Sequence, residues 1–289
     1  MLDIQILSVM NYRLSLVLIV FSLLFGCLKE ESYVPAYQQK LIVDGRIELG
    51  RHAIVSLSLN EKYDGGIDSL ELSDMIVRWA KVTVSNGVES EILTGRFNED
   101  YQQKFIYTGS EIVGKENETY TLNIEYSGQS WSATTTIPEA SELHDISVEW
   151  VNDTLYRIKA YLPPTPNNVP CMVECALNES MYYKPALACI FDSNVSGGYV
   201  TINRPINYTE IKSYTTLFNI QDVVRLRFST MPQFGYDYWS MWENNVINNL
   251  NPIFPAQHNP ISNISNNAIG AWIGYASVYY DVKKAEPQQ

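Results

Sequence analysis

Hydrophobic and polar residues alternate along much of the chain beyond Lys40, which is the period of β-strands with one buried face. The alternation is clearest in three segments: residues 53–59, 80–84 and 120–126. Asn86-Gly87 and Ser127-Gly128-Gln129 follow two of these segments and suit tight turns, because glycine tolerates positive φ. Pro138 then stops the last strand of this series. The pattern predicts a first β-sandwich domain, immunoglobulin-like, over residues 41–138.

The second half repeats this alternation and then changes period once. Alternating positions predict strands over residues 146–150, 156–162, 171–177, 224–228 and 268–282. Between residues 236 and 250 the spacing becomes helical, with Trp239, Trp242 and Val246 on one side. We therefore predict an all-β chain with two sandwich-like domains, the second β-rich over residues 143–284 with a short helix near 236–250.

An apolar run near the N-terminus is too short to span a membrane. Residues 14–26 follow a single arginine, and thirteen helical residues rise only about 20 Å, against about 30 Å of hydrocarbon core. The run is therefore interpreted as part of a signal peptide over residues 1–26. Leu24-Phe25-Gly26-Cys27 resembles the lipobox of bacterial lipoproteins, in which the cysteine receives lipid before cleavage. We expect Cys27 to anchor the chain to a membrane.

The segment after this cysteine reads as a lipid-anchored tether over residues 27–40. Lys29, Glu30 and Glu31 resemble the export signal that sends Bacteroidota lipoproteins to the outer face of the outer membrane. A polar tether without a signal has a similar composition, so that alternative stays open.

Composition then limits the partners and the compartment. The chain has 289 residues, 46% of them hydrophobic, which is enough for a large core, and its net charge is −12. An acidic surface repels phosphates, so we expect no nucleic acid partner.

Three cysteines remain after Cys27, namely Cys171, Cys175 and Cys189. Cys171 and Cys175 are four strand residues apart, roughly 13 Å, so they cannot bond to each other within an intact strand. A disulfide between Cys175 and Cys189 is compatible with an exported compartment, and buried free thiols are the alternative.

The sequence contains no recognised catalytic, nucleotide-binding or zinc motif around its histidines, so we expect no catalytic residues, metal or cofactor. The acidic residues Asp64, Asp68, Glu71 and Asp74 could offer oxygen ligands to calcium, but a solvated acidic turn fits their spacing better. Trp239, Trp242 and Trp272 could form a glycan-binding platform, although core packing explains their spacing better.

Two tripeptides match a short O-glycosylation pattern of Bacteroidota, an aspartate followed by a hydroxyl residue and an apolar residue. They place candidate glycosylation at Ser69 and Thr154, both in predicted turns.

Several segments in fixed order together resemble one family across residues 27–282. They are the lipobox, Leu41-Ile42-Val43-Asp44-Gly45, the Tyr120–Pro138 hairpin, Asp222-Val223-Val224-Arg225-Leu226, Tyr236-Asp237-Tyr238-Trp239, Asn259-Pro260-Ile261-Ser262-Asn263-Ile264 and Ala268-Ile269-Gly270-Ala271. The family is a Bacteroidota outer-membrane lipoprotein family known as domain of unknown function, serial 4249. Gln221 stands where that family usually has glycine.

The resemblance implies a β-rich lipoprotein of the outer membrane, often thought to accompany TonB-dependent transporters, and it implies no established catalytic residues. We therefore expect a surface-exposed, non-catalytic binding or accessory module for such a transporter. The alternatives are a structural or assembly role in the cell envelope and, less favoured, a hydrolase.

Overall fold

The structure is a computed structural model that describes residues 38–60, 75–101, 103–194, 197–205, 217–249 and 261–282. The chain divides into two compact units, Met1–Gln38 and Gln39–Gln289, and the described residues lie almost wholly in the second.

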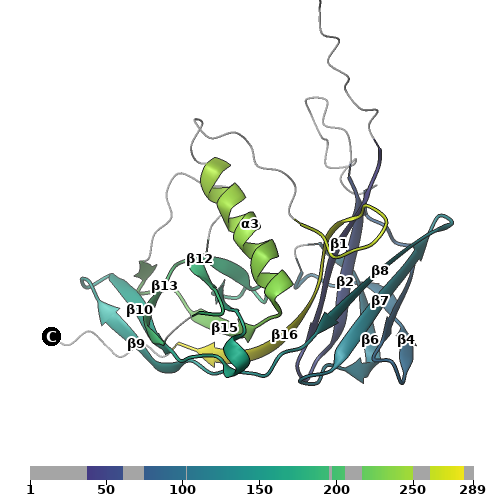
Figure 1. Cartoon of the computed structure of the whole chain (residues 1–289). Helices are drawn as coiled ribbons and strands as arrows, with labels where there is room; N and C mark the ends of the chain where they lie inside the picture. The colour runs from purple at the N-terminus through teal and green to yellow at the C-terminus, as the bar shows by residue number, and fades with distance from the viewer. Residues whose placement is uncertain are drawn as a thin grey trace, which may run out of the picture. The chain divides into compact units, whose positions relative to one another are not determined.

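Three β-sheets account for most of the described residues (Figure 1). The largest has eight strands in the order β12 (Lys184–Phe191), β11 (Cys171–Leu177), β15 (Val224–Thr230), β16 (Ile269–Asp281), β1 (Leu41–Glu48), β2 (His52–Leu59), β6 (Phe105–Val113) and β5 (Thr94–Phe97). A four-stranded sheet has the order β4 (Ser90–Ile92), β3 (Lys81–Ser85), β7 (Thr119–Tyr126) and β8 (Gln129–Thr136). The other four-stranded sheet has the order β13 (Gly198–Ile202), β10 (Leu155–Leu162) and β14 (Phe218–Asn219), with β9 (His144–Trp150) also paired to β10.

Each four-stranded sheet shares a hydrophobic core with one half of the eight-stranded sheet. In the first core Val55 of β2 and Leu122 of β7 are fully buried together. In the second core Ile158 of β10 and Phe228 of β15 are fully buried together. The all-β, sandwich-like class predicted from the sequence is therefore confirmed.

The last strand, β16, connects the two halves of the large sheet by changing partner along its length. Residues Ile269–Tyr275 pair in parallel with β1, and residues Ala276–Asp281 pair antiparallel with β15. The strands of the two predicted domains thus continue into one sheet. Whether residues 41–138 and 143–284 also fold as independent domains stays a prediction.

One glycine makes the pairing between β16 and β1 possible. Gly270 has φ of +111°, and a Cβ atom built there would lie 1.9 Å from the carbonyl oxygen of Val43. A side chain at this position would be excluded both by this contact and by the backbone conformation.

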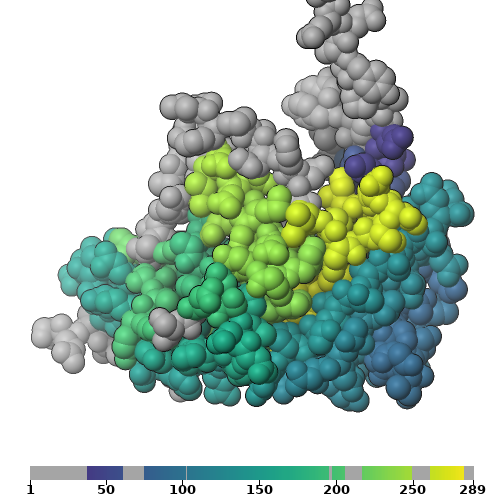
Figure 2. Space-filling model, viewed as in Figure 1, coloured from purple at the N-terminus to yellow at the C-terminus, as the bar shows by residue number. Residues whose placement is uncertain are grey.

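The helix α3 (Gln233–Asn249) contacts the face of the large sheet that points away from the two cores. Its residues Phe234, Tyr238 and Trp239 pack on a small cluster that includes Ile273 and Tyr275 of β16. Figure 2 shows the light-green surface of α3 beside the yellow segment that leads into β16. The helix predicted near residues 236–250 is confirmed; it begins at Gln233, directly after Pro232, whose carbonyl accepts a hydrogen bond from the N–H of Tyr236.

The predicted hairpin turn between β7 and β8 is also confirmed. Ser127 and Gly128 connect paired residues Tyr126 and Gln129, with φ values of 51° and 75°. Positive φ at both central residues is the geometry of the turn that matches strand twist.

Candidate functional site

Two features of the described residues depart most from an ordinary β-sandwich, a buried charge cluster and an exposed apolar groove. The charge cluster is formed by Arg46, Glu48, Glu174, Arg227 and Tyr279. Its members lie on the large sheet, and strand register places Glu174, Arg227 and Tyr279 beside one another on β11, β15 and β16.

Arg227 is the centre of this charge cluster. Its Nε and Nη2 atoms each lie 2.6 Å from a carboxylate oxygen of Glu174, and its Nη1 lies 3.2 Å from Oε1 of Glu48. Glu48 also accepts a hydrogen bond of 2.6 Å from the hydroxyl of Tyr279 and lies 2.8 Å from Nε of Arg46. The cluster thus links ionic partners from both halves of the sheet.

Electrostatics keep these groups charged despite their burial. Burial alone raises the pKa of Glu48, but the guanidinium groups of Arg46 and Arg227, with the Tyr279 hydroxyl, lower that pKa to about 2. Burial lowers the pKa of Arg227, and the carboxylates of Glu174 and Glu48 raise it well above its ordinary value. Because each charge has its partner inside the protein, the charge cluster is suited to holding strands together rather than to proton transfer.

The apolar groove lies at the open side of the first sandwich, where β4 and β5 end their sheets. Its volume is about 690 Å³, and it is lined by Arg78, Trp79, Ala80, Lys81, Ile92, Leu93, Gly95, Phe97, Phe105 and Tyr107. The exposed fractions are 90% for Trp79, 67% for Phe97 and 61% for Ile92. Three large apolar side chains exposed around one groove mark a binding surface better than scattered apolar residues do.

Aromatic contacts fix the floor of the groove. The Phe105 ring lies edge-on to Phe97 at 5.4 Å and to Tyr107 at 5.5 Å between centroids. The Tyr107 hydroxyl donates to the carbonyl of Val77 and accepts from the N–H of Ala80, both at 3.0 Å. These two bonds hold the segment that carries Trp79 against the large sheet.

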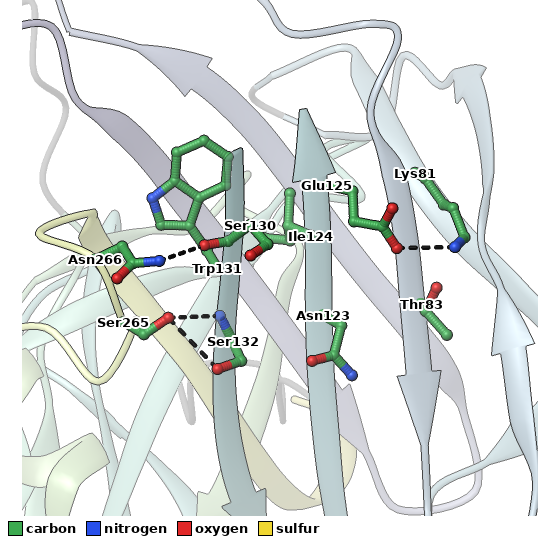
Figure 3. Close-up of a pocket in the computed structure, with 10 residues that line it drawn as sticks. All are labelled: Lys81, Thr83, Asn123, Ile124, Glu125, Ser130, Trp131, Ser132, Ser265 and Asn266. Carbon is green, nitrogen blue, oxygen red and sulfur yellow. Dashed lines mark hydrogen bonds and ion pairs between the residues drawn. The ribbon is translucent and has the colours of Figure 1, made fainter. Parts of the chain in front are cut away.

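A second hollow of about 440 Å³ lies on the outer face of the sheet β4-β3-β7-β8 (Figure 3). Ser265 accepts a hydrogen bond of 2.8 Å from the N–H of Ser132, and Asn266 donates to the carbonyl of Ser130. Figure 3 also shows the exposed ion pair of Lys81 with Glu125 at 2.8 Å. This hollow is polar and its side chains pair with one another, so it is a weaker binding candidate than the apolar groove.

Several residues predicted as sites lie outside the described residues. They are Cys27, Lys29, Glu30, Glu31, Ser69 and the acidic set Asp64, Asp68, Glu71 and Asp74. Thr154 is described and is exposed in the turn between β9 and β10. Its hydroxyl donates to Oδ1 of Asn152 at 3.0 Å.

The cysteines of β11 and β12 are free buried thiols. Cys171, Cys175 and Cys189 form no bond with one another, so the disulfide between Cys175 and Cys189 that the sequence allowed is not present in the structure. Burial raises the pKa of Cys171 and Cys189 to about 12, which disfavours the reactive thiolate.

The three tryptophans considered as a glycan platform do not share a surface. Trp272 is fully buried in the first core, and its indole donates to the carbonyl of Tyr120 at 3.0 Å. Trp239 is half-buried and donates to the Tyr275 hydroxyl at 2.8 Å, with its ring 5.5 Å from that of Trp242. Core packing therefore explains Trp272.

Within the described part of the chain, no group of three or more histidine, cysteine or acidic residues has metal-binding geometry. The same residues include no helix that is long and apolar enough to cross a membrane.

The fold and these surfaces define the chain as a β-sandwich protein with an exposed apolar groove. Over residues 30–284 it matches the family described as Domain of unknown function (DUF4249), and it belongs to that family. A comparison with curated proteins finds no match.

Proposed function

We propose that this protein is a lipid-anchored lipoprotein on the surface of the outer membrane, where it acts as a non-catalytic accessory module for a TonB-dependent transporter. The lipobox-like segment ending at Cys27 and the Lys29-Glu30-Glu31 motif support the anchor and the location. A lipid anchor confines the body to one membrane surface, so a partner in the same membrane is met at high effective concentration.

The observation that carries the binding role is the apolar groove. Trp79, Ile92 and Phe97 remain exposed although the same chain buries two full cores. Aromatic anchors in a pocket dominate the energetics of protein interfaces, and covering these side chains removes apolar area from water. The groove is thus the surface through which we expect the transporter to be contacted.

The chemistry of the described residues supports a non-catalytic role. The buried thiols have raised pKa values, and the charged residues of the charge cluster pair with one another.

Copurification tests the proposal. The lipidated full-length protein, extracted from its own membranes in mild detergent, should retain an outer-membrane β-barrel protein that mass spectrometry identifies. The double variant Trp79→Ala and Phe97→Ala should lose most of it, because both aromatic anchors are removed. Tyr199→Ala is the matched control, since Tyr199 is 65% exposed on the other sandwich. If no barrel is retained by the wild type, or the double variant retains it equally, the proposal fails.

An envelope-assembly role is the second candidate, and one observation favours it. The charge cluster and β16 join both sandwiches into one sheet, which is the construction expected of a rigid spacer. In that case soluble envelope proteins rather than a barrel should copurify with the wild type.

A further inference from the structure

The strand β5 at the edge of the groove has backbone groups that point away from its only partner. Within the described residues β5 is the last strand of the large sheet and pairs with β6 alone. The N–H of Asn98 bonds to the carbonyl of Lys104, which identifies that pair as hydrogen-bonded. Because hydrogen-bonded and non-hydrogen-bonded pairs alternate in antiparallel strands, the backbone groups of Gly95 and Phe97 face outward.

We propose that β5 receives an extended strand from the protein partner, so that the groove binds a peptide segment by β-strand addition. This inference rests on the proposed binding function and specifies what is bound. An added strand would pair with the outward N–H and C=O groups of Gly95 and Phe97, while its own alternate side chains entered the groove.

The side chains of the groove suit alternate apolar residues of the added strand. The Phe105 ring packs directly on the backbone of Gly95, because a Cβ atom there would lie 2.8 Å from Cζ of Phe105. Phe97 and Ile92 line the groove from the two sheet edges, and Trp79 lines it beside them. A strand side chain placed between these groups would be covered by apolar atoms on several sides.

The charges beside the groove favour an acidic strand. Arg78 and Lys81 line the groove, and the exposed side chain of Arg96 lies on β5 itself. The Arg78 guanidinium lies 5.6 Å from the centre of the Phe97 ring. Lys81 is paired with Glu125, whereas Arg96 lies on the face of β5 opposite Gly95 and Phe97. Residues of the added strand that alternate with its apolar residues would lie on that same face, so carboxylates at those positions complement Arg96.

The test uses the full-length lipidated protein in detergent micelles and a library of random peptides displayed on beads. Enriched peptides should alternate apolar and acidic residues. Their binding should slow amide hydrogen exchange at Gly95 and Phe97 by about tenfold or more, because these amides become hydrogen-bonded. The variant Trp79→Ala should weaken binding by roughly tenfold or more, and Tyr199→Ala should not.

Three outcomes overturn the inference: no peptide is enriched, enriched peptides leave exchange at Gly95 and Phe97 unchanged, or these amides are already protected by self-association of the protein. The last outcome would assign the edge to a second copy of this chain. If no peptide binds but the groove variants still lose the copurified barrel, the accessory function stands and strand addition is rejected. If peptides bind at β5 but no barrel copurifies, strand addition stands and the transporter-accessory function is rejected.

Discussion

Proteins usually bury apolar side chains and expose charged ones, and the charge cluster and the apolar groove both depart from this rule. The first buries charged groups, and the second exposes aromatic groups. Arg227, Glu48 and Glu174 are buried, and each has ionic partners within the same sheet. Trp79 and Phe97 are largely exposed at a sheet edge. The comparison shows that buried charge is tolerated where its partners are internal, whereas an exposed aromatic cluster indicates a partner supplied from outside.

The largest expected effect comes from removing the centre of the charge cluster. Arg227→Ala should lower the free energy of unfolding by about 3–5 kcal/mol, because it leaves Glu174 and Glu48 buried without their main cation. Denaturant unfolding measures the loss. The matched control is Lys159→Ala in the exposed pair with Glu149, which should cost far less because solvent screens both charges. Equal losses in the two variants would contradict the comparison.

Acid should weaken the charge cluster through Glu48. Its pKa falls from an ordinary 4.5 to about 2 in the folded protein, so the unfolded state binds the proton more tightly. The stabilisation is fully present above about pH 4.5 and is lost as pH falls towards about 2. At about 1.4 kcal/mol per pKa unit, the loss amounts to roughly 3 kcal/mol.

Unfolding measured across this pH window should therefore show a steeper decline for the wild type than for Glu48→Gln, which does not titrate. Parallel pH profiles would show that Glu48 is not the group responsible.

A smaller effect is expected where β16 joins β1. Gly270→Ala should destabilise the protein by about 2 kcal/mol or more, because the new Cβ meets the Val43 carbonyl and φ is +111°. Gly50→Ala is the matched control, since Gly50 also has positive φ, +71°, but has open space around it. It should cost about 1 kcal/mol. Thermal unfolding distinguishes the two, and a smaller loss at Gly270 than at Gly50 would refute the close-contact argument.

The sequence predicts best those strands that have one face in the core and one in solvent. Tyr120, Leu122 and Ile124 are fully buried, while Asn123 and Glu125 between them are exposed. Strands in the centre of the large sheet lose this signal. Residues Cys171–Ala176 of β11 are all buried, because both faces of this strand are covered. The alternating pattern therefore identifies the strand but not that its second face is buried as well.

The two unusual features differ in how far sequence could reveal them. Glu48 and Arg227 are 179 residues apart, and only the partner change of β16 brings them together. No local pattern carries that information. Trp79 does leave a signal: it lies just before β3, and period-two spacing places it with polar Lys81 and Thr83 rather than with the buried positions Val82 and Val84. A large aromatic on the polar phase of a strand indicates exposure.

The smallest expected effect on stability belongs to the groove. Trp79 is 90% exposed, so Trp79→Ala removes little apolar area from the folded interior and should change the free energy of unfolding by no more than about 0.5 kcal/mol. The same change should reduce barrel copurification strongly, because an anchor residue contributes to binding only when a partner covers it. Denaturant unfolding measures the effect on stability, and copurification from the same protein preparation measures the effect on barrel binding. A loss of stability comparable to that of Arg227→Ala would mean that Trp79 packs within its own domain, and the groove would then lose its claim as an interaction surface.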